Sequence, residues 1–344
     1  MSRGGLAQRL PRLWFRARLS PLLLPLLPLS WLFRGIAALR RFLYRKGILA
    51  AVALPVPVIV VGNLTVGGSG KTPLVLWLAE RLRARGRHPG IVSRGYGGGE
   101  AVRPVLPDSA AAAVGDEPLL LARRGGVPVF VGRDRAAAGK ALLAAHPECD
   151  VLVSDDGLQH YRLARRVEIA VFDRRGAGNG RLLPAGPLRE PLARLAGVTA
   201  VVFNGGAANV PAAGAPCFPM HLFGRRFTAL DDPRKTCSAE DLRGKNLHAL
   251  AGIGDPSRFF AQLAAMGLEF SAHPFPDHQA YGADDLAFAR HGVLLMTEKD
   301  AVKCAGLALS EAWVLPVEAC IDDAPDGSSL LDIILEKLHG RTSA

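Results

Sequence analysis

The first 79 residues of this 344-residue chain contain no aspartate or glutamate, and the first acidic side chain is that of Glu80. Ten Arg or Lys residues lie between Arg3 and Lys46, so the N-terminal segment carries most of the formal net charge of +11. The remainder of the chain is almost neutral. A general nucleic-acid-binding surface would need basic residues spread through the folded domain together with aromatic side chains, and the sequence does not predict one.

The chain has five cysteines, and none of them forms a Cys-x-x-Cys pair. They are Cys149, Cys217, Cys237, Cys304 and Cys320. An odd number of widely spaced cysteines predicts neither a disulfide framework nor a zinc site. A reducing cytoplasm is the compartment that fits this pattern best.

Long unbroken hydrophobic runs are missing as well. The most apolar stretch, Ser20–Phe33, has 14 residues and contains three prolines. A helix that spans a membrane needs about 20 apolar residues. Arginines rather than a small-residue cleavage site follow the stretch, so we do not expect a cleaved signal peptide.

Basic and apolar residues follow a helical period on both sides of this stretch. After it, one predicted face carries Leu32, Ile36, Leu39 and Leu43, and the opposite face carries Arg34, Arg41 and Arg45. We expect residues 1–50 to form amphipathic helices in the headgroup plane of an anionic membrane, with about 1 kcal/mol of attraction for each basic residue. A helix packed against the protein's own core is the alternative.

A glycine-rich turn between a predicted strand and a predicted helix is the clearest motif. The apolar run Val58–Val61 predicts a buried parallel strand, and Lys71 begins an apolar helical segment. The glycines allow successive backbone amides to cradle a phosphate at the helix N-terminus, and Lys71 would reach the β and γ phosphates of ATP. The predicted nucleotide-binding residues are Thr65, Val66, Gly67, Gly68, Ser69, Gly70, Lys71 and Thr72, with Thr65 standing where a strict P-loop has glycine.

A second apolar strand pattern, in Val151–His160, leads into two adjacent carboxylates. This is typical of a Walker B strand, whose carboxylate holds Mg²⁺ directly or through water. The sequence therefore predicts Asp155 and Asp156, together with the hydroxyl of Thr72, as ligands of Mg²⁺. A simple cap at the junction of strand and loop is the alternative interpretation of the two aspartates.

Further loops carry polar residues after predicted strands or before a predicted helix. Arg94 and Tyr96 follow the strand Gly90–Ser93, and Arg133 follows the strand Pro128–Val131. In open α/β sheets, ligands bind at the carboxyl ends of the strands, so Arg94 and Tyr96 are candidates for ligand contacts, with an ordinary glycine loop as the alternative. Arg133 could face phosphates. Asp116 precedes an apolar helical segment, where an acidic residue often does no more than complement the helix dipole.

The order of these elements predicts an α/β fold. We expect a P-loop NTPase-like domain with a mostly parallel sheet flanked by helices, and a second, smaller α/β domain. The segments Val167–Asp173 and Ala200–Asn204 are expected to add strands to the parallel sheet. The expected divisions are residues 1–50 for the N-terminal amphipathic anchor, 51–216 for the P-loop core and 217–344 for the smaller C-terminal domain.

Six segments, in this order, resemble the tetraacyldisaccharide 4'-kinase family. They are GNLTVGGSGKTP from Gly62, SRGYGG from Ser93, GDEP from Gly115, DDGLQH from Asp155, LLPAGPLREP from Leu182 and TEKDAVK from Thr297. No single segment is specific, but the set is. The resemblance also accounts for Thr65, because the family departs from a strict P-loop in the same way.

The resemblance implies transfer of the ATP γ-phosphate, with Mg²⁺, to the 4'-hydroxyl of a tetraacylated glucosamine disaccharide 1-phosphate, which gives a lipid A precursor. The acceptor is embedded in the bacterial inner membrane, which implies a peripheral, monotopic location on its cytoplasmic face. The resemblance points to Asp116, assisted by His278, as the base, and places Arg189 in an active-site segment. Arg133 and Arg189 are candidates for stabilising charge, and Asp156 is the rival base.

A membrane-tethered ATPase or GTPase switch is the main alternative function. The guanine-reading Asn-Lys-x-Asp signature is missing, since the aspartate of TEKD directly follows Lys299. The carboxylate sites argue against a third class, a non-catalytic membrane scaffold. The sequence indicates no protein partner.

Overall fold

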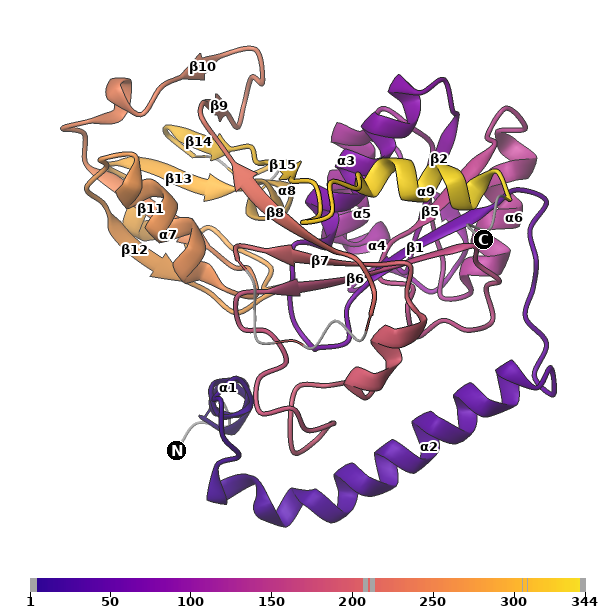
Figure 1. The fold of residues 1–344 in the computed structure, drawn as a ribbon. Helices are drawn as coiled ribbons and strands as arrows, with labels where there is room; N and C mark the ends of the chain where they lie inside the picture. The colour runs from indigo at the N-terminus through magenta and orange to yellow at the C-terminus, as the bar shows by residue number, and fades with distance from the viewer. Residues whose placement is uncertain (1–4, 207–209, 211–213, 305, 308, 341–344) are drawn as a thin grey trace.

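The computed structural model describes residues 5–206, 210, 214–304, 306–307 and 309–340. These residues form two β-sheets that lie side by side, with the N-terminal helices below the larger sheet in the view of Figure 1. The two sheets have separate cores, and the chain passes between them twice.

The larger sheet has nine strands within the described ranges, in the order β15-β8-β7-β6-β1-β5-β2-β4-β3. All its strands are parallel except the edge strands β15 (Glu318–Ile321) and β3 (Arg103–Pro104), which are antiparallel to their neighbours. The parallel strands are β1 (Val58–Gly62), β2 (Pro89–Ser93), β4 (Val129–Val131), β5 (Val151–Ser154), β6 (Val167–Asp173), β7 (Ala200–Asn204) and β8 (Cys217–Phe223). The predicted mostly parallel α/β fold is therefore confirmed.

Each face of the larger sheet buries its own set of side chains. Along β1, Ile59 and Val61 belong to one core cluster, whereas Val58 and Val60 belong to the other. This alternation is the period of two expected for a strand that is buried on both faces. The first face is covered by α3 (Lys71–Ala84), α5 (Asp116–Gly125) and α9 (Leu330–Leu338), and the second by α6 (Arg135–Ala145) and η2 (Leu192–Gly197).

The smaller sheet comprises six strands among the described residues, in the order β10-β9-β14-β13-β11-β12. Its strands are β9 (Phe227–Ala229), β10 (Thr236–Cys237), β11 (Leu247–Ala251), β12 (Ser271–Pro274), β13 (Val293–Thr297) and β14 (Ala312–Leu315). Its helices are α7 (Pro256–Ala265) and α8 (Glu298–Lys303), with the short elements η3 (Glu240–Leu242) and η4 (Ala287–Ala289). The short helix α4 (Ala111–Val114) belongs to the larger unit.

The division between the two sheets differs from the expected boundary at residue 216. Strand β8 pairs with β7, β15 pairs with β8, and α9 packs in the core of the larger sheet. The smaller unit is thus an insertion between β8 and β15. A change of sequence texture near Cys217 does not reveal this return, because pairing partners are set by tertiary structure and not by local pattern.

The N-terminal segment forms α1 (Gly5–Trp14), η1 (Pro21–Leu26) and α2 (Leu27–Arg45). Two hydrogen bonds attach it to the loop at residues 182–191: Trp14 Nε1 donates to the Pro184 carbonyl at 2.9 Å, and Ser30 Oγ donates to the Leu182 carbonyl at 2.8 Å. The rest of α2 lies along the bottom of the molecule (Figure 1). Residues 1–4 of the expected anchor lie outside the described residues.

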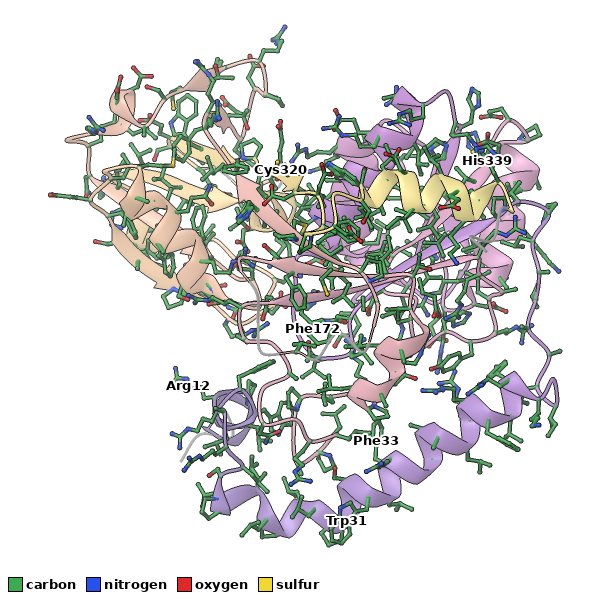
Figure 2. The ribbon with its side chains drawn as sticks, viewed as in Figure 1. Arg12, Trp31, Phe33, Phe172, Cys320 and His339 are labelled. Carbon is green, nitrogen blue, oxygen red and sulfur yellow. The ribbon has the colours of Figure 1, made fainter. Side chains whose placement is uncertain are left out.

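Helix α2 turns most of its apolar side chains outward. Leu32, Ile36 and Leu39 are each about 60% exposed, and Figure 2 shows Trp31 pointing away from the body while Phe33 points toward it. By length and composition, Pro21–Arg45 could cross a membrane, a property that some signal sequences and buried core helices share. The helical stretch is longer than the apolar run from which the sequence predicted no span.

We expect Ile334→Ala, in α9, to lower the free energy of unfolding of the larger unit by about 2 to 5 kcal/mol, because it leaves a cavity under the sheet. Ile334 is fully buried in the same cluster as β1 and α3. The measurement is urea unfolding followed by the fluorescence of Trp77, with the other three tryptophans replaced. Glu336→Ala, at an exposed position on the same helix, is the control. Equal stability of the two variants would contradict the packing of α9 on the larger sheet.

Candidate active site

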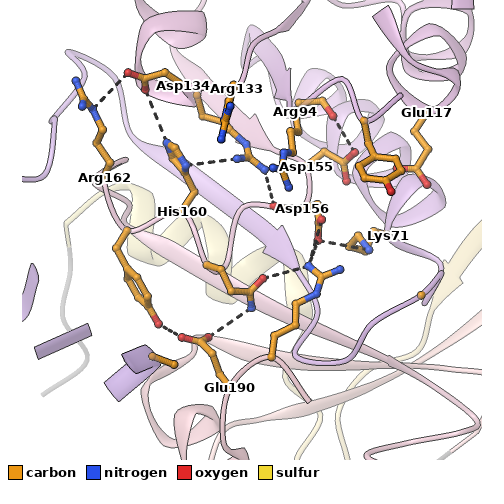
Figure 3. Close-up of a pocket in the computed structure, with 18 of the residues that line it drawn as sticks. Lys71, Arg94, Glu117, Arg133, Asp134, Asp155, Asp156, His160, Arg162 and Glu190 are labelled. Atoms are coloured by element: carbon orange, nitrogen blue, oxygen red, sulfur yellow. Dashed lines mark hydrogen bonds and ion pairs between the residues drawn. The ribbon is translucent and has the colours of Figure 1, made fainter. Parts of the chain in front are cut away.

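The carboxyl ends of four neighbouring parallel strands, β1, β5, β2 and β4, meet at one edge of the larger sheet. The loops that follow them carry most of the side chains predicted to be functional. Between these loops, α2 and the loop after β12 lies a pocket of about 1130 Å³, part of which is shown in Figure 3. A volume of this size exceeds that of typical small-ligand sites and could hold a nucleotide together with part of a second ligand.

The glycine-rich loop has the conformation that its glycines predict. Gly67 and Gly70 have φ values of 94° and 88°. Gly70 also leaves no room for a side chain, since a Cβ atom there would lie 2.0 Å from Nδ2 of Asn204. The same Nδ2 donates to the Ser69 carbonyl at 3.1 Å. The end of β7 therefore fixes the turn that leads into α3.

The predicted nucleotide-binding residues fall into two groups. Gly67, Gly68 and Lys71 line the pocket. Thr65 and Val66 instead bridge to the loop at 182–191: Thr65 pairs with Leu188, and the Val66 amide donates to the Pro187 carbonyl at 2.9 Å. Ser69, Gly70 and Thr72 complete the turn and the first residues of the helix.

Asp156 is the centre of a group of cations. Its carboxylate lies 3.5 Å from Lys71 Nζ and 3.3 Å from Arg189 Nη1, and its carbonyl accepts a hydrogen bond from Arg135 at 2.9 Å. Burial raises the pKa of Asp156, but Lys71, Arg189 and Arg135 outweigh it and lower the pKa to about 2. The residue has a left-handed φ of 47°, which turns its side chain toward these cations.

Asp155 is fully buried beside it and differs in character. Ser93 Oγ donates to its Oδ2 at 3.3 Å, while Oδ1 has no hydrogen-bond partner within the described part of the chain. Burial first, and the charge of Glu117 second, raise the pKa of Asp155 to about 7. A buried carboxylate oxygen without a donor fits a site that receives a cation.

The oxygen atoms predicted to bind Mg²⁺ suit that ion chemically. The Thr72 hydroxyl and the two aspartate carboxylates are hard donors, which Mg²⁺ prefers. The described residues contain no cluster of three or more His, Cys, Asp or Glu side chains able to hold a metal. Mg²⁺ commonly binds only one or two protein carboxylates, because substrate phosphates and water occupy its other coordination positions.

Asp116 and His278 come together from the two sheets. Asp116 is the first residue of α5, and His278 lies in the loop after β12 with a left-handed φ of 62°. The Asp116 carboxylate is 3.2 Å from His278 Nδ1. His278 lines the pocket and its ring centroid lies 4.9 Å from that of Tyr96, while Asp116 is buried beside it.

Lys299 ties this pair to both sheets, and sequence reasoning noted it only as part of the TEKDAVK segment. Its Nζ lies 2.9 Å from Glu117, 3.0 Å from Asp277 and 3.9 Å from Asp116. Burial lowers the pKa of Lys299, but these three carboxylates outweigh it and raise the pKa above its usual value. The ammonium is therefore held charged at the junction. The signal for it was a lysine in the first turn of the helix that follows a buried strand.

The charges around the pair shift both of its pKa values. Burial raises the pKa of Asp116, but the hydrogen bond to His278 and the charge of Lys299 outweigh it and leave the pKa below its usual value. The hydrogen bond to Asp116 raises the pKa of His278 against burial, which lowers it. Asp116 is thus ionised at neutral pH, and His278 gains basicity from it.

A buried hub holds Lys299 and the His278 loop in place. Asp300 is fully buried and accepts hydrogen bonds from Tyr281 Oη at 2.7 Å, Thr297 Oγ1 at 2.6 Å and the Gly252 amide at 3.1 Å. It adjoins Lys299 in sequence, and Tyr281 follows His278 by three residues. The hub therefore connects the segment that carries His278 with the segment that carries Lys299.

The two predicted arginines differ in their surroundings. Arg189 lies inside the site, where it contacts Asp156 and donates to Gln159 Oε1 at 3.2 Å. Arg133 lines the pocket but is 69% exposed and paired with Glu100 at 2.8 Å. The structure brings Arg189 to the P-loop lysine and leaves Arg133 at the rim.

Comparison with known proteins gives consistent matches. A sequence profile described as tetraacyldisaccharide-1-P 4'-kinase matches residues 22–337. A tetraacyldisaccharide 4'-kinase of Dechloromonas aromatica (strain RCB) is 57% identical over 342 residues, which cover 98% of this chain and 100% of the relative. Another, of Azoarcus sp. (strain BH72), is 57% identical over 337 residues and covers 97% of both chains.

Among solved structures, one described as the "apo" form of LpxK from Aquifex aeolicus in complex with ATP matches with a TM-score of 0.77. The two chains are 31% identical, and the match covers 92% of this chain and 99% of the other.

Gly70→Ala should weaken the binding of a fluorescent ATP analogue by about 10-fold or more, because the added Cβ strains the backbone and displaces Asn204. Gly86→Ala is a matched control: Gly86 also has a positive φ, of 75°, but no atom lies within 4 Å of its added Cβ. That control should lose about 1 kcal/mol of stability and no nucleotide affinity. Equal affinities in the two variants would contradict the role assigned to the turn.

Proposed function

Because this chain belongs to the tetraacyldisaccharide-1-phosphate 4'-kinase family, we propose that the pocket at the edge of its larger sheet is where its reaction takes place. The protein is an ATP-dependent lipid kinase that uses Mg²⁺ and transfers the ATP γ-phosphate to the 4'-hydroxyl of tetraacyldisaccharide 1-phosphate in lipid A biosynthesis. The observation that carries the placement is the meeting of Asp116 and His278, 3.2 Å apart, with the P-loop lysine in the same site.

The triphosphate binds along the glycine-rich loop. Backbone amides from Gly67 to Thr72 face its oxygens, and Lys71 neutralises the charge of the β and γ phosphates. Arg189 contacts the same carboxylate as Lys71, so its guanidinium lies where it can stabilise the negative charge that develops on the leaving oxygen. Arg133 contributes less because it is exposed at the rim and paired with Glu100.

Thr72, Asp155 and Asp156 would hold Mg²⁺, and the Oδ1 of Asp155, which has no hydrogen-bond partner among the described residues, supports this assignment. The ion would supply neutralisation of the charge on the phosphate oxygens.

Asp116 is the general base, and His278 assists it. The acceptor oxygen forms a bond to the γ-phosphorus as the bond from that phosphorus to the β–γ bridging oxygen breaks, and ADP leaves. The proton of the acceptor hydroxyl passes to the Asp116–His278 pair. His278 lines the pocket and shares the positive charge that the pair gains.

Asp156 is a weaker candidate for the base than Asp116. Two cations lie within 3.5 Å of its carboxylate, and they lower its pKa to about 2. A carboxylate held in this way is a poor proton acceptor and a good partner for cations. The contacts therefore favour a binding role for Asp156 and a catalytic role for Asp116.

Helix α2 supports a location of the pocket close to a membrane surface. Its outward face is apolar and its C-terminal half is basic, which is the composition of a helix that lies in the headgroup region. An N-terminal apolar helix of this kind is consistent with membrane association. We infer that the protein lies peripherally on the cytoplasmic face of the bacterial inner membrane, where its lipid acceptor and ATP are both accessible.

Asp116→Asn should lower kcat by about 10² to 10⁴-fold with unchanged ATP affinity, because it removes the proton acceptor and keeps the shape. His278→Ala should lose less activity. It removes a hydrogen bond that lowers the pKa of Asp116, so that pKa rises and the acid limb of the kcat/KM profile moves to higher pH. The measurement is transfer of labelled phosphate from pH 4 to 9. An unshifted limb, or a loss in His278→Ala as large as in Asp116→Asn, would contradict these roles.

The double substitution Leu32→Asp with Leu39→Asp should release the protein from vesicles of phosphatidylethanolamine and phosphatidylglycerol. Each exposed leucine contributes about 1.5 to 3 kcal/mol when it is buried. The control is the double substitution Leu106→Asp with Phe223→Asp. Leu106 and Phe223 are also exposed apolar residues, and their replacement adds the same charge outside α2. Cosedimentation of both double variants with vesicles would contradict membrane contact through α2.

A further inference from the structure

The glycine-rich loop contacts the carboxyl ends of three neighbouring strands, β7, β6 and β1, which Figure 1 shows next to one another. Each of these strand ends supplies one side-chain donor to the loop. Asn204 is the last residue of β7, Arg175 follows the end of β6 by two residues, and Asn63 follows β1 directly. The two asparagines are fully buried.

The three donors hold three successive carbonyl groups of the loop. The hydrogen bonds run from Asn63 Nδ2 to the Gly67 carbonyl at 3.0 Å, from Arg175 Nη2 to the Gly68 carbonyl at 3.0 Å and from Asn204 Nδ2 to the Ser69 carbonyl at 3.1 Å. Three peptide units in a row are therefore each fixed by a side chain from outside the loop.

These hydrogen bonds also set the direction of three backbone amides. In a trans peptide unit the carbonyl and the N–H point in opposite directions, so a donor that holds the carbonyl turns the N–H of the next residue away from itself. The amides turned in this way are those of Gly68, Ser69 and Gly70, and none of them donates to a backbone carbonyl in the described part of the chain. Successive amides of this kind form a concave site for an anion.

Arg175 is held firmly enough to act as a fixed donor. The carboxylate of Asp173, the last residue of β6, accepts from its Nε at 2.9 Å. The ring of Phe15, which directly follows α1, covers the guanidinium, with 4.3 Å from its centroid to Cζ. A planar guanidinium that is already oriented loses little conformational freedom when it donates to a further acceptor.

Asn204 is oriented by the smaller unit. Arg258 Nη2, in α7, donates to its Oδ1 at 2.6 Å. Since arginine can only donate, the oxygen of the amide faces Arg258 and the nitrogen is left to face Ser69. Arg175 reaches the smaller unit as well, because its Nη1 donates to the Gly254 carbonyl at 3.4 Å.

A loop that is fixed in this way suits a polyphosphate. If one of the three peptide units turned over, a carbonyl oxygen would replace an N–H on the side where phosphate oxygens arrive, and the two kinds of oxygen would repel each other. Donors that already point at the ligand need no reorganisation when it binds, so more of the interaction energy remains as affinity.

We propose that Asn63, Arg175 and Asn204 are positioning residues that hold the glycine-rich loop in its phosphate-binding form before ATP binds. The proposal rests on the function proposed above. The three side chains act through the carbonyls of the loop and not by touching the phosphates. Their loss should therefore weaken the binding of the phosphate chain and should do so whether or not a nucleoside is attached to it.

The test is isothermal titration calorimetry of the full-length protein in non-ionic micelles with Mg²⁺ and either ATP or inorganic tripolyphosphate. Arg175→Ala and Asn63→Ala should each raise the Kd of both ligands by a similar factor, about 5- to 50-fold. The number of binding sites per chain should stay that of the native protein. Damage to the fold would do the reverse: fewer sites per chain, each with the native Kd.

Arg174→Ala is the matched control for Arg175→Ala. Arg174 is the adjacent residue, and its hydrogen bonds go to Asp255 and Ser257 of the smaller unit and not to the glycine-rich loop. The control thus removes the same charge and a contact between the units, and it should change the Kd of either ligand by less than about 2-fold. Arg175→Lys should recover part of the affinity, because an ammonium can still donate to the Gly68 carbonyl.

Native Kd values in both Arg175→Ala and Asn63→Ala, or an equal loss in Arg174→Ala, would overturn the proposal. Failure of the proposed site itself is distinct: Lys71→Met would then bind ATP as tightly as the native protein, since the triphosphate would lie elsewhere. Asn63→Ala changes no charge, so it keeps the test decisive if Arg175→Ala does not fold.

Discussion

The cluster around Lys299 is the interaction on which the arrangement of the site depends. One buried ammonium contacts Glu117 of the larger sheet and Asp277 of the smaller unit, and Asp116 and His278 meet beside it. A charge buried in this way is stable only while its carboxylates surround it. The two units therefore cannot separate without exposing uncompensated charge, and the contact between Asp116 and His278 exists only while they are together.

The N-terminal helices are connected to the chemistry through the loop at 182–191. Trp14 and Ser30 donate to carbonyls of that loop, and further along it Arg189 reaches Asp156. The same loop pairs with Thr65 of the glycine-rich turn. The N-terminal helices are thus connected by a few hydrogen bonds to the loop that contacts both Asp156 and the glycine-rich turn.

Much of this could be predicted from local pattern, and the exceptions have a common cause. The strands around the P-loop are buried on both faces, so they appear as apolar runs, and Asp155 and Asp156 follow one of them in a recognisable way. The return of β8, β15 and α9 to the larger sheet has no local signal. Nor does the role of Lys299, whose partner Glu117 lies 182 residues away in sequence, or the contact of Arg175 with the glycine-rich loop. These depend on which segments tertiary structure brings together.

Asp116, the base that we propose, has a lowered pKa, which bears on how its carboxylate would accept a proton. Asp116 is ionised at neutral pH because His278 and Lys299 stabilise its charge, and the same stabilisation makes it a weaker base. Phosphoryl transfer tolerates this, since its transition state is loose and the hydroxyl becomes acidic only as the bond to phosphorus forms. His278 has the opposite shift, because the neighbouring carboxylate favours its protonated form. In the proposed reaction, the imidazole of His278 can hold the proton while Asp116 keeps its charge next to Lys299, so the ion cluster stays intact.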